Sequence, residues 1–436
     1  MDKVNVTIDM SQCDYAIVGG GIAGLYFARE LSKKYPSAKI EVFEKYKILG
    51  GRVKTYSTTV NGKKIQYESG AGRVFEDHIQ VRKLLKEYDC TEIPISDEIL
   101  WKPSYESPLE KNVFEHSLPV WLPELQKLPA DELANHTLHT LLVRIFGPIE
   151  ARQMTIQFPY WAEIFTMRAD LAIDSFRQEM GTHKGYMVVK EGYEKMIQGL
   201  IRDCKKNGVK IFSNYDVKEF FPSKTGFEIH IATGPLKLKE KRNVIVCECK
   251  NLILATHPVA MKKFSLLKDW ELLSKVKMDP LCRVYSVFPV EKSGVSWFSS
   301  IPKFVTPTPL RYFIPINPAT GLVMISYTDG KDTEKIKEIW DKKGEEYLGK
   351  YLTEECQKHF SKEKIPEPLF TKVEYWSEGA SYWLPGNYNP QEESKKSIQP
   401  FPKIFPNLYV CGEGFSMRQA WMEGAVESAI ELLKHI

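Results

Sequence analysis

The sequence predicts an α/β protein with two parts: one built on a parallel sheet assembled from separate stretches of the chain, and an α+β part with an antiparallel sheet. The apolar run 15–18 ends in three glycines, apolar side chains recur at helical spacing over 25–35, and another apolar run begins at 40–43. A strand–helix–strand unit of this kind pairs its strands in parallel. The antiparallel sheet is predicted over 281–327, which is rich in β-branched and aromatic residues.

The other elements follow from the same periodicities. Helices are expected over 191–206, 332–360 and 421–434, and helical patterns occur among the prolines and aromatics of 76–185. Strands are expected over 210–212, 227–231, 243–249, 252–256 and 408–411. The apolar stripe of the helix 332–360, which predicts core packing, consists of Ile336, Ile339, Trp340, Tyr347, Leu348, Tyr351 and Leu352.

The α/β pattern is interrupted twice, which predicts a discontinuous first domain. Residues 1–75, 186–275 and 400–436 are assigned to the domain with the parallel sheet. Residues 76–185 and 276–399 are assigned to the second domain, where we expect the substrate to bind. A chain of 436 residues is long enough for two such domains.

Composition excludes several classes of protein. With 43% apolar and 27% charged residues, the chain is globular, and its net charge of +4 gives no field that would favour nucleic acid or an anionic membrane. The longest apolar stretch, 15–27, is too short to span a bilayer, and the first residues lack the apolar run of a secretory signal. We therefore expect a cytoplasmic protein with no membrane partner; the sequence does not indicate the oligomeric state.

The cysteines and histidines predict no metal site. Eight cysteines are too few for a disulfide-rich scaffold. Cys247 and Cys249 have no second pair at zinc-ligand spacing and are expected to be free thiols of a buried strand. His136 and His139 lack a third ligand nearby and are expected to be surface or core histidines.

A glycine motif indicates a dinucleotide site. Gly19, Gly21 and Gly24 form G-x-G-x-x-G between the first strand and helix, and Glu44 ends the second strand. In this arrangement the first glycine permits the turn, the second lets the backbone approach a pyrophosphate, and the third lets helix and strand pack closely. The carboxylate suits an unphosphorylated ribose and favours FAD or NAD over NADP. The alternative is a purely structural turn.

A second glycine turn bears on which dinucleotide would bind. Gly50, Gly51 and Arg52 follow the second strand, where an arginine can bind the pyrophosphate from the other side. Together, residues 14–56 resemble the FAD-binding segment of the flavin-dependent amine oxidase family, which includes monoamine, polyamine and L-amino-acid oxidases. The resemblance implies a Rossmann-like FAD domain and further cofactor contacts from Ile22, Ala23 and Lys45.

The C-terminal end resembles the same family. Residues 407–413 resemble its strand that ends in Gly-Glu, here Gly412 and Glu413, and residues 421–428 resemble its closing helix, whose N-terminus points at the isoalloxazine. The resemblance further implies cofactor contacts from the residues Gly70, Ala71, Gly72, Arg73, Val217, Trp421, Met422 and Ala425. Because this chain has no cysteine where monoamine oxidases attach the flavin, FAD is expected to be bound non-covalently.

The resemblance also suggests how a substrate would be held. Trp421 aligns with one of two aromatic rings that guide an amine to the flavin, and the second ring is Tyr382 or Trp383, a choice that a local deletion leaves open. For each of these aromatics the alternative is ordinary core packing. The expected task of the two rings is to orient the amine and exclude water.

Two arginines bear on the substrate and the electron acceptor. Arg73 lies where L-amino-acid oxidases bind the substrate carboxylate, a role that suits a guanidinium; alternatively it pairs with an acidic neighbour or contacts FAD. Arg283 occupies the position of a family lysine that holds a water against flavin N5, so reaction with O2 is less certain than in the family. Residues 76–185 match no family motif.

These observations predict an FAD-dependent amine oxidase. The expected reaction is oxidation of an amine or amino-acid C–N bond to an imine by hydride transfer to flavin N5, with O2 reduced to H2O2. The expected partners are a small amine or amino acid and O2. Two alternatives remain: a desaturase or dehydrogenase of the same scaffold acting on a non-amine substrate, and a non-catalytic binding protein stabilised by FAD.

Overall fold

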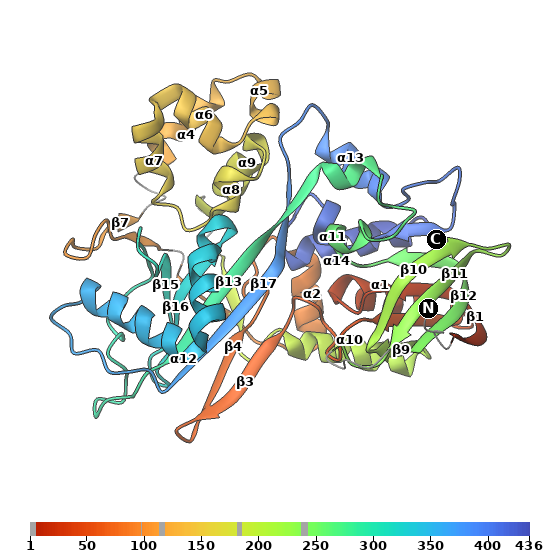
Figure 1. The fold of residues 1–436 in the computed structure, drawn as a ribbon, viewed down its shortest axis with the longest axis horizontal. Coiled ribbons are helices and arrows are strands. Elements are labelled where there is room, and N and C mark those ends of the chain that lie inside the picture. Colours follow the sequence, from red (N-terminus) through yellow and green to blue (C-terminus); the bar gives the residue numbers. More distant parts are fainter. Residues whose placement is uncertain (1–5, 97, 113–117, 181–184, 237–242) are drawn as a thin grey trace.

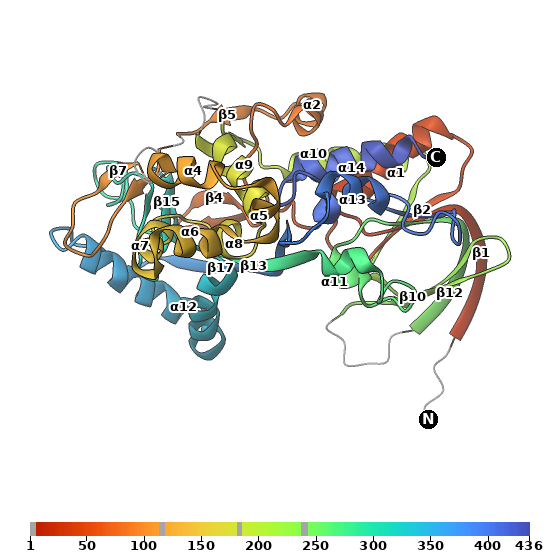
Figure 2. The ribbon, with the colours of Figure 1, turned by 90° about the horizontal axis from the view of Figure 1, so that it is seen from above.

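The computed structural model describes residues 6–96, 98–112, 118–180, 185–236 and 243–436. It contains two seven-stranded sheets and two small two-stranded sheets (Figures 1 and 2). The helices α4–α9 gather in one lobe at the end of the molecule far from the first sheet, and the long strands β13 and β17 of the second sheet run between the two parts.

The first sheet combines parallel and antiparallel pairs. In spatial order its strands are β10 (Tyr215–Pro222), β11 (Phe227–Thr233), β12 (Asn243–Leu254), β1 (Val6–Val18), β2 (Ile40–Glu44) and β9 (Lys210–Ser213), with β18 (Leu408–Val410) paired to β12. β1 pairs in parallel with β2 and β12, and β10, β11 and β12 form an antiparallel meander. The parallel strand–helix–strand opening is therefore confirmed, whereas the two strands predicted over 243–249 and 252–256 are one continuous strand.

Two hydrophobic cores cover the faces of the first sheet. Alternate side chains of β1 point in opposite directions, so that Ile17 packs in one core and Ala16 and Val18 in the other. The first core lies against the helices α1 (Ile22–Lys34), α2 (Ile79–Glu87), α10 (Glu194–Lys206) and α14 (Met422–Leu433). The second core includes side chains of α11 (Pro258–Met261) and of the 3-10 helices η1 (Glu271–Ser274) and η3 (Glu413–Phe415).

The second sheet confirms the antiparallel prediction over 281–327. Its spatial order is β17 (Phe370–Trp383), β13 (Val276–Val287), β16 (Leu322–Asp329), β15 (Tyr312–Asn317), β14 (Phe304–Val305), β6 (Leu100–Trp101) and β7 (Glu110–Asn112). The small sheets pair β3 (Thr55–Val60) with β4 (Lys63–Glu68), and β5 (Glu92–Pro94) with β8 (Met187–Val189). The hairpin β3–β4 packs on the second sheet through Tyr67, whose ring centroid lies 3.8 Å from that of Tyr285.

Helix α12 (Thr333–His359), preceded by the 3-10 helix η2 (Gly330–Asp332), covers the second sheet but is broken at Gly344, whose φ and ψ of 83° and 176° are not helical. The break shifts the helical periodicity. Ile336, Leu348 and Leu352 are buried as predicted, but Tyr347 is 50% exposed. Its predicted place in the apolar stripe is wrong because the stripe assumed one uninterrupted helix.

The lobe contains the helices α4 (Leu118–Gln126), α5 (Ala130–Asn135), α6 (Leu138–Phe146), α7 (Pro148–Thr155), α8 (Ala162–Phe165) and α9 (Ala169–Met180). Arg311, which directly precedes β15, and Asp329 at the end of β16 hold the backbone from the end of α7 to the start of α8. Arg311 donates to the carbonyl oxygens of Ile156 (2.8 Å) and Phe158. The carboxylate of Asp329 accepts the N–H groups of Trp161 (2.8 Å) and Ala162 (2.9 Å).

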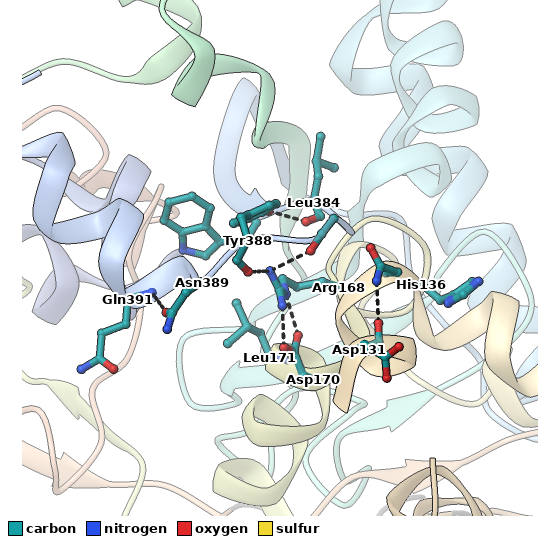
Figure 3. A network of polar contacts seen from close by, with 12 residues as sticks. Asp131, His136, Arg168, Asp170, Leu171, Leu384, Tyr388, Asn389 and Gln391 are labelled. Atoms are coloured by element: carbon teal, nitrogen blue, oxygen red, sulfur yellow. Dashed lines mark hydrogen bonds and ion pairs between the residues drawn. The ribbon is translucent and has the colours of Figure 1, made fainter. Parts of the chain in front are cut away.

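A buried arginine joins the lobe to the chain between β17 and α13 (Pro390–Ser397) (Figure 3). The guanidinium of Arg168 donates to Asp170 through two nitrogens, at 2.7 and 2.8 Å, and to the carbonyl oxygen of Tyr388 at 3.0 Å. The guanidinium carbon also lies 4.9 Å from the centroid of the Tyr388 ring. The side chain of Arg168 is 3% exposed, so these contacts form away from water.

Among the described residues, no helix is long and apolar enough to cross a lipid bilayer. Cys247 and Cys249 are buried free thiols of β12, as expected. Within the described ranges, no cluster of three or more His, Cys, Asp or Glu side chains is arranged to hold a metal ion.

We expect Arg168→Ala to lower the free energy of unfolding by about 2–4 kcal/mol, because it removes a buried guanidinium that donates to Asp170 and to the carbonyl oxygen of Tyr388. Arg177→Ala is the matched control: Arg177 pairs with Asp174 on the same helix at the surface, and its loss should cost less than about 0.5 kcal/mol. Urea unfolding of both variants measures the difference. Equal effects would mean that the Arg168 network does not stabilise the lobe.

Candidate active site

The turn after β1 leaves room at one glycine and none at its neighbours. Gly19 has φ of 115°, and a Cβ there would lie 2.4 Å from the carbonyl oxygen of Ala255; a Cβ on Gly24 would lie 2.1 Å from that of Gly19. A Cβ on Gly21 would meet no atom within 4 Å. Helix α1 starts after Gly21 with no side-chain cap and no acidic residue in its first turn, which also contains Ile22 and Ala23. Open backbone and an uncapped helix N-terminus suit a phosphate.

Glu44 lies at the carboxyl end of β2, beside this turn. Its buried carboxylate accepts the N–H groups of Gly20 (2.7 Å) and Tyr46 (2.8 Å). Burial raises the pKa of Glu44, against the lowering effect of the two N–H groups. Each carboxylate oxygen keeps a further lone pair with which it can accept a ribose hydroxyl. Lys45, the next residue, lies with its ammonium 5.6 Å from the Tyr46 ring centroid.

Val217 reaches the same end of the sheet through β10. It is 9% exposed and packs in the second core. The loop before β10 is joined to the loop after β2 by a hydrogen bond of 3.1 Å from the N–H of Asn214 to the carbonyl oxygen of Tyr46. This hydrogen bond brings the start of β10 close to the residues that follow Glu44; the nucleotide contact of Val217 stays a prediction.

The second glycine turn contacts the first. The N–H of Gly50 donates to the carbonyl oxygen of Gly20 at 2.8 Å. Gly51 has φ of 60°, and a Cβ there would lie 3.4 Å from the Cα of Gly21. At Gly50, which has φ of 103°, a Cβ would lie 2.6 Å from the carbonyl oxygen of Val53. Gly50 is thus required for space and for its positive φ, whereas Gly51 is favoured by its positive φ alone.

Arg52 connects this turn to the C-terminal motif. Its guanidinium pairs with the carboxylate of Glu413 at 2.7 Å and donates to the carbonyl oxygen of Gly379 at 2.9 Å. Glu413 also accepts from the hydroxyl of Ser381 and the N–H of Ala420, both at 3.0 Å. Burial alone would raise the pKa of Glu413, but Arg52 and the two hydrogen bonds together lower it below its ordinary value. Glu413 is therefore a buried anion paired with a half-buried cation.

The last helix also starts without a side-chain cap. Trp421 is the N-terminal capping residue of α14, and the side chain of Glu423 in the first turn instead accepts the N–H groups of Gln80 and Val81 at the start of α2, both at 2.8 Å. Met422 and Ala425 are buried beneath this end. Gly412, with φ of 132°, leaves open space where a Cβ would meet no atom nearer than 3.9 Å.

These features fit a dinucleotide cofactor. The open faces of Gly21 and Gly412 and the uncapped starts of α1 and α14 provide backbone for phosphates and for an anionic ring. Glu44 and Arg52 lie beside these turns, and a carboxylate and a cation are the groups that suit a ribose and a pyrophosphate.

The four predicted residues Gly70, Ala71, Gly72 and Arg73 follow β4 after one intervening residue, Ser69. Arg73 extends into a group of aromatic rings: its guanidinium carbon lies 4.2 Å from the ring centroid of Tyr186 and 5.5 Å from that of Trp421. Its Nη2 donates to the hydroxyl of Tyr160 at 2.7 Å. The fold thus brings together Arg73 and Trp421, two residues far apart in the sequence.

The sequence analysis missed Tyr160, Tyr186 and His78, all of which surround this pair. The ring of His78 lies 4.9 Å from that of Trp421, and burial lowers its pKa to about 4, so the imidazole is neutral near pH 7. Tyr160 and His78 come from the stretch 76–185, which carries no family motif, and Tyr186 directly follows it. The chain has many aromatic residues, and the local sequence does not distinguish Tyr160 or Tyr186 as a neighbour of Arg73.

Tyr382 and Trp383 point to opposite faces of β17. Trp383 is fully buried in the second core of the first sheet, and its indole N–H donates to the carbonyl oxygen of Ser416 at 3.0 Å. Tyr382 belongs to the core of the lobe, together with Tyr160. Of the two, Tyr382 shares a cluster with a residue that contacts Arg73, which favours it as the second aromatic ring.

Arg283 on β13 contacts the backbone of the segment before Arg73. Its Nη1 donates to the carbonyl oxygens of Glu68 (3.2 Å) and Gly70. The guanidinium carbon lies 5.5 Å from the ring centroid of Tyr327. Arg283 is thus close to the predicted cofactor segment 70–73.

The two sheets, the glycine turns and the Arg52–Glu413 pair together form a site that fits a dinucleotide. The chain belongs to the family described as flavin containing amine oxidoreductase, whose model matches residues 22–431. The predicted family and fold class are confirmed, and a flavin is the cofactor of this family.

Individual proteins are similar over nearly the whole chain. An uncharacterized protein of Acanthamoeba polyphaga mimivirus is 22% identical over 517 aligned residues, which cover 99% of this chain and 95% of that protein. A single-substitution variant of putrescine oxidase superposes with a TM-score of 0.71 at 16% identity, covering 98% of this chain and 100% of that one. Wild-type putrescine oxidase bound to putrescine gives a TM-score of 0.68 at 16% identity, with 98% of each chain covered. At these identities the solved structures demonstrate a shared fold.

We expect Gly21→Val to fold but to lose its flavin. The position has φ of −75° and open space around it, so valine fits the protein but occupies the approach of the pyrophosphate. The flavin absorbance per mole of purified protein, together with a thermal melt, measures both properties. Gly24→Ala is the control: its Cβ clashes with backbone, so it should destabilise the fold itself. A folded Gly21→Val protein with one flavin per chain would contradict the phosphate-binding assignment.

We expect Glu413→Gln to lower the free energy of unfolding by about 2–3 kcal/mol near pH 7, because Arg52 loses its charged partner. The folded-state pKa of Glu413 lies below its unfolded value. Its stabilisation is therefore complete above the unfolded pKa and is lost as the pH falls through the folded pKa. The difference between wild type and variant in urea unfolding should shrink in acid.

The control for this comparison is Glu431→Gln, which removes a surface pair with Lys434 and should change stability by less than about 0.5 kcal/mol. A Glu413→Gln effect that stays constant from neutral to acid pH would show that the charge of Glu413 is not what stabilises the site.

Proposed function

We propose that this chain oxidises the C–N bond of an amino acid to an imine, which water then hydrolyses, using non-covalently bound FAD. When bound, the flavin would accept a hydride at N5 from the carbon next to the nitrogen and would pass the electrons to O2, giving H2O2. The observation that carries the choice of an amino acid is the position of Arg73, whose guanidinium lies beside Trp421 at the uncapped start of α14.

The surroundings of Arg73 support binding of a carboxylate. Its guanidinium stacks on Tyr186 and is oriented by the hydroxyl of Tyr160, so its direction is partly fixed before a ligand binds. A planar guanidinium forms paired hydrogen bonds with a carboxylate. A carboxylate bound there would place the adjacent carbon and nitrogen near Trp421.

The aromatic residues would orient the substrate and exclude water. Trp421, Tyr186 and, on the side of the lobe, Tyr382 present ring surfaces rather than charges. The amine must be neutral to lose a hydride from its neighbouring carbon. A neutral His78 beside Trp421 adds no positive charge, and its Nδ1 already accepts the N–H of Phe75 at 3.3 Å. The scheme requires no side-chain general base.

The cofactor contacts follow from the same geometry. The amides at the start of α1 and Arg52 would bind the pyrophosphate, Glu44 a ribose, and the start of α14 the isoalloxazine. The division into a discontinuous FAD domain and a substrate domain is part of this proposal. So is the cytoplasmic location expected from the sequence.

We expect FAD to co-purify with the protein and to be released completely by acid, because the segment that carries the covalent link in monoamine oxidases has no cysteine here. Absorbance of the supernatant and of the precipitate after acid treatment measures the released and retained flavin. Flavin that remains in the washed precipitate would contradict non-covalent binding.

We expect Arg73→Ala to weaken kcat/KM for an amino acid by roughly 2–5 kcal/mol, and to affect the matching decarboxylated amine far less. Arg73→Lys should rescue only partly, because an ammonium lacks the paired geometry. The measurement is kcat/KM for matched substrate pairs with flavin content determined in each variant. Equal losses for both members of each pair would refute carboxylate binding and would favour a simple amine or polyamine substrate.

An anaerobic screen tests the reaction class itself. Bleaching of the bound flavin by an L-amino acid, a monoamine or a polyamine would support amine oxidation and would rank the three substrate classes. A flavin that no amine bleaches would favour the desaturase or the non-catalytic alternative.

A further inference from the structure

The second sheet holds the backbone of residues 68–70 through three side chains. Glu68, Ser69 and Gly70 each present a carbonyl oxygen toward strands β13 and β17. Arg283 Nη1 donates to the first and third of these oxygens, at 3.2 Å to Glu68 and also to Gly70. The hydroxyl of Tyr285 donates to Glu68 at 2.8 Å, and the indole N–H of Trp376 donates to Ser69 at 2.8 Å. Three consecutive carbonyl groups are thus bound by side chains rather than by a neighbouring strand.

The opposite side of the same segment is bound by the turn after β2. The N–H groups of Ser69 and Ala71 donate to the carbonyl oxygens of Lys54 and Arg52, both at 2.9 Å. A Cβ on Gly70 would lie 2.0 Å from the carbonyl oxygen of Arg52, so the two backbones are in direct contact. The segment is therefore enclosed between Arg52 on one side and β13 and β17 on the other.

Of the three side chains, Arg283 contacts the segment closest to Arg73. A Cβ on Gly72 would lie 3.3 Å from Arg283 Nη1, so the guanidinium lies against the backbone one residue before Arg73. Its Nε is buried and makes no hydrogen bond with any described residue. The guanidinium therefore acts on the segment through Nη1, while its carbon remains over Tyr327.

We propose that Arg283 is a positioning residue that fixes the segment 68–73 and thereby presents the Arg73 guanidinium for carboxylate binding. The substrate part of this proposal rests on the proposed function. The physical reason is that the direction of a long side chain is set first by its backbone, and a carboxylate bound by two parallel hydrogen bonds tolerates little misplacement. A lysine at this position would keep the charge but would not reproduce the rigid planar donor.

The experiment compares Arg283→Lys, Arg283→Gln and Tyr285→Phe with a control on the same strand. Tyr285→Phe removes only the hydroxyl that binds Glu68, so it tests the segment without changing charge. Ser286→Ala is the control, because its hydroxyl contacts Thr371 and not the segment. Amide hydrogen exchange of the peptide covering 68–74 is measured in each purified protein, and KM and kcat are measured for matched amino-acid and amine substrates.

We expect both Arg283 variants to speed exchange in this peptide by about tenfold or more, Tyr285→Phe to speed it less, and Ser286→Ala to leave it at the wild-type rate. We expect KM for the amino acid to rise about five- to tenfold in the Arg283 variants, with smaller changes in kcat and in KM for the amine. A rise in KM for the amino acid alone would indicate a misplaced Arg73, whereas a general loss of structure would change kcat and both KM values.

Unchanged exchange in both Arg283 variants would overturn the proposal. Faster exchange with equal changes in KM for the amino acid and the amine would overturn the link to carboxylate selectivity. If the wild-type flavin is bleached by no amine or amino acid, the proposed function is wrong, and the exchange measurement alone decides whether Arg283 holds the segment.

Discussion

The contact between Arg52 and Glu413 is the constraint on which the cofactor site depends. It joins the turn after β2 to the C-terminal motif, and both partners also bind β17, Arg52 through the carbonyl oxygen of Gly379 and Glu413 through the hydroxyl of Ser381. Because a buried charge is costly without its partner, these three stretches must meet for any of them to be stable there. The Arg52–Glu413 contact thus determines the position of the second glycine turn, and the proposed role of the glycines is to leave space for phosphates.

On the substrate side, too, a few polar side chains position segments that are distant in the sequence. Arg73, and Tyr160, which contacts it, lie on irregular backbone, and this backbone is bound by side chains in or directly beside the second sheet. Arg311 and Asp329 hold the stretch that carries Tyr160, and Arg283 holds the stretch that carries Arg73. The contact between Tyr160 and Arg73 therefore joins two segments whose positions are both set by one sheet. The second sheet thus supports Arg73 and Tyr160, which it does not itself contain, and carries Tyr382 on its own strand β17.

The sequence predicted those features that depend on short stretches of chain. The strand–glycine–helix opening, the Gly-Glu motif at 412–413 and the antiparallel region 281–327 are each defined by local spacing, and the structure contains all three. The aromatic group around Arg73 could not be predicted, because Tyr160, Tyr186 and Trp421 become neighbours of Arg73 only through tertiary folding. The choice between Tyr382 and Trp383 required knowing which face of β17 is covered by which core, and Tyr347 was misplaced because Gly344 interrupts its helix.

The separation of Arg52 and Glu413 along the chain has a consequence for how the protein is made. Domains on a ribosome fold from the N-terminus as the chain emerges, and contacts between distant residues form late. The glycine turn is synthesised long before β18 and α14, which pair with its sheet and pack in its helical layer. A flavin site that uses both the glycine turn and the start of α14 cannot form until α14 has been translated. On the proposed geometry, FAD therefore binds only after the roughly 400 residues separating these two parts have been synthesised.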